Sequence, residues 1–189
     1  MDIAGGIVLL LVALPIIVIA ALGSAFATRH FPFYVQRRVG YLGKEFRMFK
    51  IRSMRRGADK EVPLDLNETG GPTFKARNDP RISAYGRLIR RASIDEMPQF
   101  LNVVLGQISL VGPRPALPDE VAQYTHSEAR RLAVKPGLTC IWQVSGRSDI
   151  PFRHWMAMDR LYIARRSTVY DLRLLALTPW TVLTMRGAR

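Results

Sequence analysis

The 189-residue sequence predicts an α+β fold that is mainly helical, and three patterns support this prediction. An uncharged apolar run of helical length comes first, between Asp2 and Arg29. Two segments in which apolar and polar residues alternate then predict one small β-hairpin. The remaining segments have helical spacing and are separated by Pro and Gly. At this length we expect one globular domain, residues 29–189, attached to an N-terminal helix, residues 1–28.

The N-terminal run GGIVLLLVALPIIVIAALGSAFA is apolar on every helical face. Such a helix belongs in a protein core or in lipid, and the run exceeds the ~20 residues that span a bilayer. A cleaved signal peptide fits less well, because Asp2 stands where a basic region is expected and the apolar run is too long. The sequence therefore predicts a membrane-attached helix.

Pro15 lies near the middle of this run and removes one backbone hydrogen bond, so we expect a bend at Leu14–Pro15. A bend fits a kinked spanning helix, and it fits equally a re-entrant helix that returns to the side it entered. Hydropathy does not separate the two. Basic residues follow the run closely, and by the positive-inside rule they place the rest of the chain in the cytoplasm. These residues are Arg29, His30, Arg37, Arg38 and Lys44.

Beyond the apolar run, FYVQRRV and KEFRMFKI alternate around the turn 40–43 and form the predicted hairpin. Pro and Gly predict a loop over residues 61–81. We expect helices at residues 82–91, 95–105, 119–134, 149–166 and 171–185. The last two helices, 149–166 and 171–185, are amphipathic and suit a membrane interface. The final one has an apolar face with Trp and Arg near its edges, which suits packing on the core equally well. That face comprises Leu172, Leu175, Trp180, Leu183 and Arg186.

The charge balance points to an acidic partner. Lys and Arg total 28 against 15 Asp and Glu, which gives a formal net charge of +13. Such an excess suits nucleic acid, an anionic membrane surface or a phosphorylated small substrate. Cys140 is the single cysteine, so the chain has no internal disulfide, and a lone Cys without a Cys–His signature is more often a packing residue than a nucleophile.

The segment RRASIDEMPQ is the most informative one for chemistry. Ser93 and Glu96 have the S-x-x-E spacing of a helix-capping box, which is a purely structural explanation. Pro98 does not suit that helix start, because it removes a hydrogen bond just beyond the first turn. The alternative is that the carboxylates react. Asp95 is suited to act as a nucleophile that forms an acyl phosphate, and Glu96 is suited to hold Mg²⁺ beside substrate phosphates.

Three further basic residues lie in segments that suit phosphate binding. Arg114 stands between two prolines in GPRP, which restrict its backbone and preorganise the guanidinium. Lys50 shares one face of an extended segment with Arg52, and Arg147 ends the turn WQVSGR, where an aromatic ring and an arginine suit a nucleotide. Each also has an ordinary explanation, as a surface turn, a solvated edge strand or a loop.

The order of these motifs resembles that of a known family. The chain has an apolar helix with a central Pro, then FKIRSM, GPTFKARNDPRIS, RRASIDEMPQFLNVVLGQISLVGPRP, KPGLT-x-x-WQVSGR and MDRLYI. This order closely resembles the monotopic phosphoglycosyl transferases, the bacterial polyprenyl-phosphate sugar phosphotransferases that begin exopolysaccharide, capsule or O-antigen synthesis. The resemblance covers essentially the whole chain. It departs at Leu14, where relatives often have Ser, and at Cys140, where they usually have Gly.

The resemblance implies roles for several residues. Asp95 would be the covalent nucleophile, and Glu96 its Mg²⁺-linked partner in an Asp-Glu dyad. Lys50 and Arg114 would bind substrate phosphate, and Arg90 would contact a phospholipid headgroup. Arg147 would bind the nucleotide, and Asp159, which lies in a matching D-x-x-Y segment, would bind the substrate phosphate or nucleotide. The family's helix with the proline break is re-entrant, so the resemblance implies a re-entrant helix here.

The implied reaction moves a sugar 1-phosphate, expected to be a hexose phosphate, from a UDP-sugar to polyprenyl (undecaprenyl) phosphate and releases UMP. Asp95 would carry the phosphosugar between two displacements. The protein would lie on the bacterial inner membrane, with its catalytic domain facing the cytoplasm. It would bind no nucleic acid. Whether it forms a homodimer is not decided by the sequence. The alternative is a non-catalytic basic membrane module for anionic lipid or nucleic acid, which does not account for the acid pair.

Overall fold

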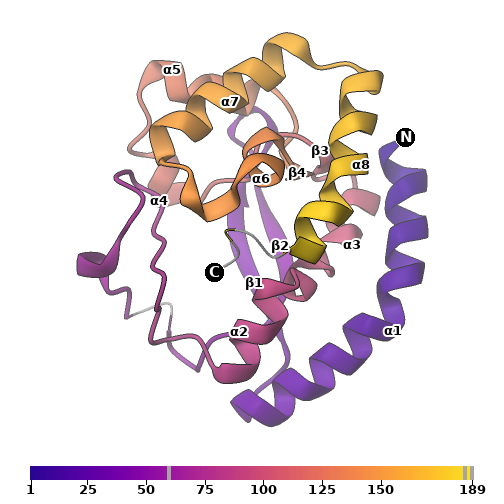
Figure 1. The fold of residues 1–189 in the computed structure, drawn as a ribbon, viewed down its shortest axis with the longest axis vertical. Coiled ribbons are helices and arrows are strands. Elements are labelled where there is room, and N and C mark those ends of the chain that lie inside the picture. Colours follow the sequence, from indigo (N-terminus) through magenta and orange to yellow (C-terminus); the bar gives the residue numbers. More distant parts are fainter. Residues whose placement is uncertain (59–60, 185–186, 188–189) are drawn as a thin grey trace.

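The computed structural model describes residues 1–58, 61–184 and 187. Over these residues the protein is mainly helical, with two small two-stranded sheets (Figure 1). The long helix α1 runs along one side of the molecule, and the hairpin β1–β2 lies near the centre. The predicted fold class is confirmed at this level: helices dominate, one apolar helix begins the chain, and one hairpin follows it.

Helix α1 spans Asp2–Thr28 and continues through Pro15. It bends near its middle (Figure 1), as expected where a proline removes a helical hydrogen bond. The face that packs on the body buries mainly small residues: Gly6, Ala13, Ile17, Ala20, Ala21 and Ser24. Its other faces are exposed, with Val12 and Ile19 at 70% and Phe26 at 88%. Only 22% of its most apolar stretch is buried, so α1 is not a core helix.

The predicted hairpin is confirmed. Strand β1 (Phe33–Val39) pairs antiparallel with β2 (Glu45–Ile51), and the short helix η1 (Tyr41–Gly43) joins them. The register sets Tyr34 opposite Lys50. The side chain of Asn102, from helix α3 (Gln99–Val104), holds β2 in place: it donates to the Arg47 carbonyl over 2.7 Å and accepts from the Phe49 N–H over 3.1 Å.

The acid-pair segment differs from the prediction. One helix over 95–105 was expected, but the chain forms the short helix η3 (Ile94–Glu96) and then α3 (Gln99–Val104). The capping box of Ser93 and Glu96 does not form, because Ser93 has a left-handed backbone (φ 55°) and makes no cap hydrogen bond. Ser83 is the residue that caps here: it starts α2 (Ala84–Arg91) by accepting from the Gly86 N–H.

The helix expected over 119–134 is also wrong as a single element. The chain forms α4 (Pro118–Val121), α5 (His126–Ala129) and the short helix η4 (Arg130–Ala133). Thr125 restarts the helix, because its hydroxyl accepts from the Glu128 N–H while the Glu128 carboxylate accepts from the Thr125 N–H. The polar composition favoured helix, but it did not reveal this second start.

A short parallel pair of strands was not expected. Strand β3 (Ser109–Val111) lies beside β4 (Gly137–Thr139), which brings the segment GPRP next to KPGLT. The approach is close: a Cβ at Gly137 would clash with the backbone of Val111 and Gly112. Glycine is therefore required at this position.

The chain ends in helical elements: α6 (Ile141–Ser145), η5 (Arg147–Asp149), α7 (Phe152–Arg165) and α8 (Thr168–Thr184). The short helix η2 (Leu64–Leu66) lies in the predicted 61–81 loop. Helix α8 buries Leu174 in the core, and Trp180 and Leu183 on its other side are 70% and 74% exposed. Met185 and Arg186, which the sequence placed in this helix, lie outside the described residues. Cys140 is buried beside Trp142 and Trp155, as expected of a packing residue.

Candidate active site

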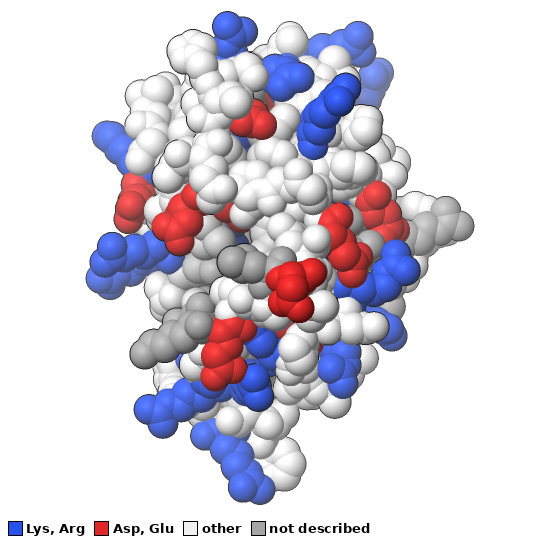
Figure 2. Space-filling view, turned by 90° about the vertical axis from the view of Figure 1, so that its left-hand side faces the viewer, with Lys and Arg blue, Asp and Glu red and all other residues white. Residues whose placement is uncertain are grey.

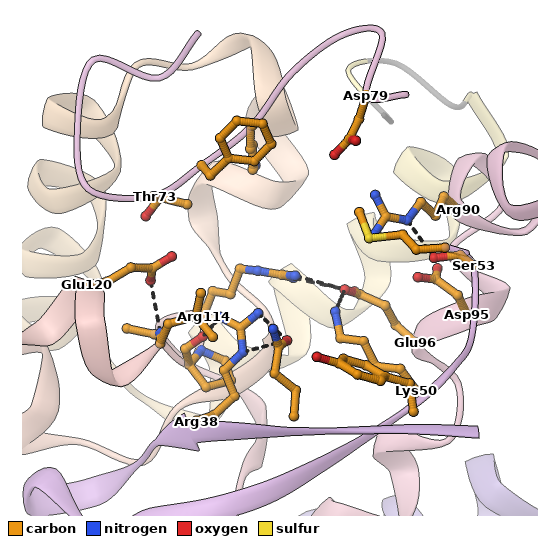
Figure 3. Close-up of a pocket in the computed structure, with 18 of the residues that line it drawn as sticks. Arg38, Lys50, Ser53, Thr73, Asp79, Arg90, Asp95, Glu96, Arg114 and Glu120 are labelled. Carbon is orange, nitrogen blue, oxygen red and sulfur yellow. Dashed lines mark hydrogen bonds and ion pairs between the residues drawn. The ribbon is translucent and has the colours of Figure 1, made fainter. Parts of the chain in front are cut away.

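A cavity of about 520 Å³ opens between the hairpin, the 61–81 loop, the acid-pair turn, the GPRP segment and helix α6. Segments far apart in the sequence therefore meet around one space. Six of the predicted site residues line it: Lys50, Arg90, Asp95, Glu96, Arg114 and Arg147. Asp159 and Pro15 do not belong to its lining. Figure 3 shows the labelled residues converging on the cavity from several elements.

The turn that carries the acid pair is supported by the apolar helix. Ile94 and Met97 pack on a cluster that contains Ala13, Ile17 and Ala20 of α1 together with Ile51 and Ile89. Because Ile94 faces α1, the next residue, Asp95, faces the cavity on the other side of the turn. The left-handed backbone at Ser93 turns the chain sharply from α2 into η3. The helix that suits a membrane therefore supports the turn from which the carboxylates enter the cavity.

Glu96 is held between two cations. Lys50 Nζ donates to Glu96 Oε1 over 2.9 Å, and Arg114 Nη2 donates to the same oxygen over 2.9 Å. The second oxygen accepts a longer bond, 3.5 Å, from Arg114 Nη1. Burial disfavours the charged carboxylate, but Arg114 and Lys50 outweigh it and hold the pKa of Glu96 well below its usual range. Glu96 is therefore an anion throughout the physiological range.

Asp95 is in the opposite state, although it is the adjacent residue. Its side chain is 5% exposed, and it forms no hydrogen bond or ion pair with any described residue. Burial, and then the negative charge of Glu96, raise its pKa to about 6, against the attraction of Lys50, Arg90 and Arg114. A carboxylate with no bound partner keeps its oxygen lone pairs free to react.

Lys50 and Arg114 respond in opposite ways to this environment. Burial lowers the pKa of Lys50 to about 8, although Glu96 favours the ammonium form. Glu96 raises the pKa of Arg114 above its already high value. Arg114 is thus a permanent cation at the base of the cavity, whereas Lys50 loses its charge only a little above neutral pH.

Two more arginines flank the acid pair, each held by a serine. Arg90 Nε donates to Ser53 Oγ over 2.8 Å, and Arg147 Nη2 donates to Ser93 Oγ over 3.2 Å. Arg90 reaches Ser53 because α2 lies directly on the end of β2, where a Cβ at Gly86 would clash with the Ser53 carbonyl. Neither arginine forms an ion pair with a described residue, so both guanidinium charges remain available to an anion.

Asp159 supports the site from outside the cavity. It is 2% exposed on α7, and its Oδ2 lies 2.9 Å from Arg131 Nη2. That nitrogen also donates to the Arg114 carbonyl over 2.8 Å, and Arg131 Nη1 donates to the Tyr124 hydroxyl over 2.7 Å. The structure thus places Asp159 behind Arg131, where it helps to hold the backbone of Arg114, and not among the groups that line the cavity.

Two lining features escaped the sequence analysis. Arg38 lies buried in the cavity wall on β1, although it was noted only as one of the basic residues after the apolar run. The alternation along β1 was the signal, because Tyr34, Gln36 and Arg38 share a face and all line the cavity. The second feature is Lys75, whose Nζ lies 4.7 Å and 4.2 Å from the ring centres of Trp142 and Trp155. This contact fixes the 61–81 loop over the cavity.

The face of the molecule shown in Figure 2 carries charges of both signs. Figure 2 shows the side of the molecule that carries α4, α5 and the loop around η2, and there acidic side chains lie across the middle with Lys and Arg above and below. Several cations instead line the cavity, where they outnumber the carboxylates. An anionic small substrate therefore fits this distribution.

The donors for a divalent cation are few. Within the described residues, no group of three or more His, Cys, Asp and Glu side chains comes together. Asp95 and Glu96 are two adjacent carboxylates in one cation-lined cavity, and Mg²⁺ commonly takes one or two protein carboxylates with substrate phosphates and water as its other ligands. The residues present fit a Mg²⁺ ion that arrives with a phosphorylated substrate.

Comparison with known proteins identifies the family. The model for the bacterial sugar transferases matches residues 1–185. The chain is 44% identical over 160 residues to the galactosyl transferase CpsE of Streptococcus agalactiae serotype III, covering 82% of this chain and 35% of the relative. It is 36% identical over 162 residues to the exopolysaccharide production protein ExoY of Rhizobium meliloti, covering 82% and 72%. It is 40% identical over 162 residues to the undecaprenyl-phosphate galactose phosphotransferase of Salmonella typhimurium, covering 82% and 34%.

This chain belongs to the bacterial sugar transferase family. The family predicted from the order of its motifs is confirmed, and so is its class of enzyme, a transferase. The chain spans about a third of the length of the Streptococcus and Salmonella relatives and 72% of the Rhizobium one.

Proposed function

We propose that this protein transfers a hexose 1-phosphate from a UDP-sugar to polyprenyl phosphate and releases UMP, as an early membrane step of exopolysaccharide, capsule or O-antigen synthesis. The observation that carries the proposal is the pairing of an unpartnered carboxylate, Asp95, with an ion-paired one, Glu96, in a cavity lined by cations. The names of the Streptococcus and Salmonella relatives, which specify galactose, favour a hexose.

In the proposed first displacement, a carboxylate oxygen of Asp95 attacks the β-phosphorus of the UDP-sugar. A bond forms between that oxygen and phosphorus, and the bond from phosphorus to the bridging oxygen breaks. UMP leaves with the electron pair, and the phosphosugar remains on Asp95 as an acyl phosphate. The raised pKa of Asp95 suits this role, because its carboxylate is destabilised by burial yet ionised above about pH 6.

In the second displacement, an oxygen of polyprenyl phosphate attacks the same phosphorus. The bond between Asp95 and phosphorus breaks, and the carboxylate is restored as polyprenyl-diphosphate-sugar forms. Lys50 and Arg114 stand 2.9 Å from Glu96 and border the space in which charge develops on phosphate oxygens. Glu96 would hold Mg²⁺ together with substrate phosphates, and the ion would supply further neutralisation of that charge.

The apolar surface of the protein supports a membrane location. The outer faces of α1 are exposed, and on α8 Trp180 and Leu183 are exposed as well. We propose that residues 1–28 form a re-entrant membrane helix and that residues 29–189 form the catalytic domain on the cytoplasmic side of the inner membrane. The bend at Pro15 and the basic residues after Thr28 support this arrangement. Helix α8 would rest at the interface with its exposed Trp and Leu side chains in lipid.

The reaction is tested with the full chain in nanodiscs, given undecaprenyl phosphate, Mg²⁺ and one UDP-sugar at a time. We expect UMP release with a UDP-hexose, and loss of that release in the Asp95→Asn variant. A wild-type chain that releases no UMP from any UDP-sugar would support the non-catalytic membrane module instead. Full turnover by Asp95→Asn would show that Asp95 is not the nucleophile.

The covalent step needs its own experiment. UDP-sugar carrying a radiolabel in the β-phosphate is mixed with the protein in the absence of polyprenyl phosphate. We expect label to remain on the denatured wild-type protein and not on Asp95→Asn. If UMP is released only when acceptor is present and no label is retained under single-turnover conditions, Asp95 acts as a base in a ternary complex.

The topology is tested by labelling single cysteines. Cys140 is 1% exposed and burial raises the pKa of its thiol, so the native residue reacts slowly with a maleimide. The variants Ile3→Cys and His30→Cys place reactive thiols at the two ends of α1. A re-entrant helix exposes both thiols to an impermeant maleimide in inside-out vesicles and neither in intact spheroplasts. Opposite labelling of the two positions would indicate a spanning helix.

A further inference from the structure

Arg38 is a buried cation that the proposed chemistry leaves without a role. Arg38 lies in strand β1, is only 8% exposed, and lines the cavity. The guanidinium Nε and Nη2 donate to Gln36 Oε1 over 3.1 Å and 2.7 Å, and Nη1 donates to the Pro115 carbonyl over 2.9 Å. All three bonds go to neutral oxygens. The side chain is therefore held firmly while its charge stays uncompensated.

The two other buried cations of the described chain, Arg81 and Arg131, each have a carboxylate partner. Arg81 pairs with Asp79 over 2.7 Å and Arg131 with Asp159 over 2.9 Å. Lys50 and Arg114 share Glu96. Arg38 forms no ion pair with a described residue, and burying a charge without an opposite charge is strongly unfavourable. An anion that enters the cavity would remove this imbalance.

The acids nearest to Arg38 are already engaged. Glu120 favours the charged form of Arg38 from a distance, but Glu120 Oε2 accepts from the Leu117 N–H over 3.0 Å at the start of α4. Glu96 also acts on Arg38 from a distance, while it is bound by Lys50 and Arg114. Neither carboxylate lies within ion-pair distance of Arg38, so no described residue supplies its counter-charge.

Arg38 has the geometry of a phosphate-binding group. A guanidinium has five N–H donors, and the three bonds to Gln36 and Pro115 leave one free on each terminal nitrogen. Two such donors in one plane match two oxygens of a phosphate. Arg114 lies close enough to lower the pKa of Arg38, after the larger effect of burial, to about 10. Two cations side by side favour an anion between them.

The position of Arg38 selects which phosphate it meets. In Figure 3, Arg38 and Arg114 lie together, and Asp95 lies on the far side of Glu96 from them. A phosphorus attacked by Asp95 must lie next to Asp95. A group bound at Arg38 is therefore a second phosphate, one step further from the reacting atom.

We propose that Arg38 binds the phosphate of the donor that leaves with the nucleoside, and that Gln36 is a positioning residue that aims the Arg38 guanidinium at it. The proposal rests on the proposed function, since it assigns the two phosphates of a nucleoside diphosphate. It adds a site for the leaving group, separate from the Asp95 end of the cavity. The same donors would also suit the phosphate of the lipid acceptor, and the experiment separates the two.

The test uses the full chain in nanodiscs and the variants Arg38→Gln, Arg38→Lys and Gln36→Leu. Arg37→Gln is the matched control, because Arg37 lies next in the strand with its side chain 80% exposed and 3.9 Å from Glu45. Binding of UMP and of uridine is measured by calorimetry, and KM and kcat are measured for each substrate. Thermal unfolding confirms that each variant is folded, and Arg38→Lys, which keeps the charge, replaces Arg38→Gln if the latter is not.

We expect Arg38→Gln to weaken UMP binding about ten- to a hundredfold, the effect of losing a charge-assisted hydrogen-bond pair. Uridine binding and the Arg37→Gln control should stay unchanged. Gln36→Leu should weaken UMP binding less, and adding it to Arg38→Gln should have no further effect, because Gln36 acts through Arg38.

Unchanged UMP binding in Arg38→Gln overturns the proposal. If the KM for polyprenyl phosphate then rises alone, the phosphate belongs to the acceptor. Equal weakening of uridine binding and UMP binding would also overturn the proposal, because a general loss of structure in the cavity would explain that result. UMP binding is read without turnover, so a chain that binds UMP through Arg38 yet releases none from UDP-sugars would contradict the reaction and not this site.

Discussion

Lys50 Nζ lies 2.9 Å from Glu96 Oε1, which joins strand β2 to the acid-pair turn 46 residues later in the sequence. This contact separates the two adjacent carboxylates into different chemical states. Glu96 is bound by Lys50 and Arg114 and has a pKa far below its usual range, while Asp95 has no partner among the described residues and a pKa of about 6. Environments that push two neighbouring carboxyl groups apart in this way are typical of active sites.

Asp95→Asn should stabilise the protein while it abolishes turnover. The folded pKa of about 6 is higher than the ordinary value near 3.9, so the folded state binds the proton more tightly and loses stability as pH rises from about 4 to 6. Above that window the ionised Asp95 costs on the order of 2–3 kcal/mol, which Asn does not. Urea unfolding in EDTA measures the difference near pH 7.5 and again near pH 4, where it should vanish. An equal difference at both pH values would contradict this account.

Lys50→Arg should remove an alkaline limb from the pH profile of kcat/KM. Burial lowers the pKa of Lys50 to about 8, so its ammonium is charged below that pH and neutral above it. If the cation is needed beside Glu96, activity falls as pH rises through about 8 in the wild type. Arg stays protonated at these pH values and keeps the charge. The profile of the variant, measured between pH 6 and pH 10 relative to its own maximum, should stay level where the wild type declines.

Asn102→Ala should weaken both the fold and the site. Asn102 is completely buried and bonds the Phe49 N–H, the Arg47 carbonyl and the Gln107 side chain. Truncation leaves buried polar groups of β2 unpaired, and the free energy of unfolding should fall by about 2–4 kcal/mol. Because Lys50 follows Phe49, kcat should fall as well. Gln123→Ala, which removes an exposed side-chain bond to the Asp119 carbonyl, serves as the control and should change neither quantity.

Asp79→Asn should remove an acid-sensitive part of the stability. Burial disfavours the Asp79 carboxylate, but its hydrogen bonds from Arg81 outweigh that effect and lower its pKa. A lowered pKa in the folded state contributes stability above about pH 4, and this contribution is lost as pH falls through the folded pKa. The difference in unfolding free energy between wild type and variant should thus be constant near neutral pH and shrink on acidification. A difference that does not change with pH would show that Arg81 binds Asn equally well.

Much of the chemistry was visible in the sequence because it rests on local patterns. The apolar run, the alternation of the hairpin strands and the motif order predicted the first helix, β1–β2 and the family. They also predicted the residue types that gather around Asp95. Two predicted helices were wrong as single elements because the chain interrupts each of them: η3 ends at Glu96 before α3 begins at Gln99, and Thr125 starts α5 within 119–134. Composition that favours helix does not reveal such interruptions.

The order of residues specifies which groups are present: an acid pair, an arginine between prolines, and an apolar helix with a proline near its middle. The partners of these groups follow from the folded arrangement. Glu96 contacts Lys50 and Arg114, and Asp159 lies behind Arg131. Among the described residues, Asp95 has no partner and the buried Arg38 has no counter-charge. The physical reason is that charge states follow burial and the distance to other charges. Those quantities depend on contacts between residues that lie far apart in the chain.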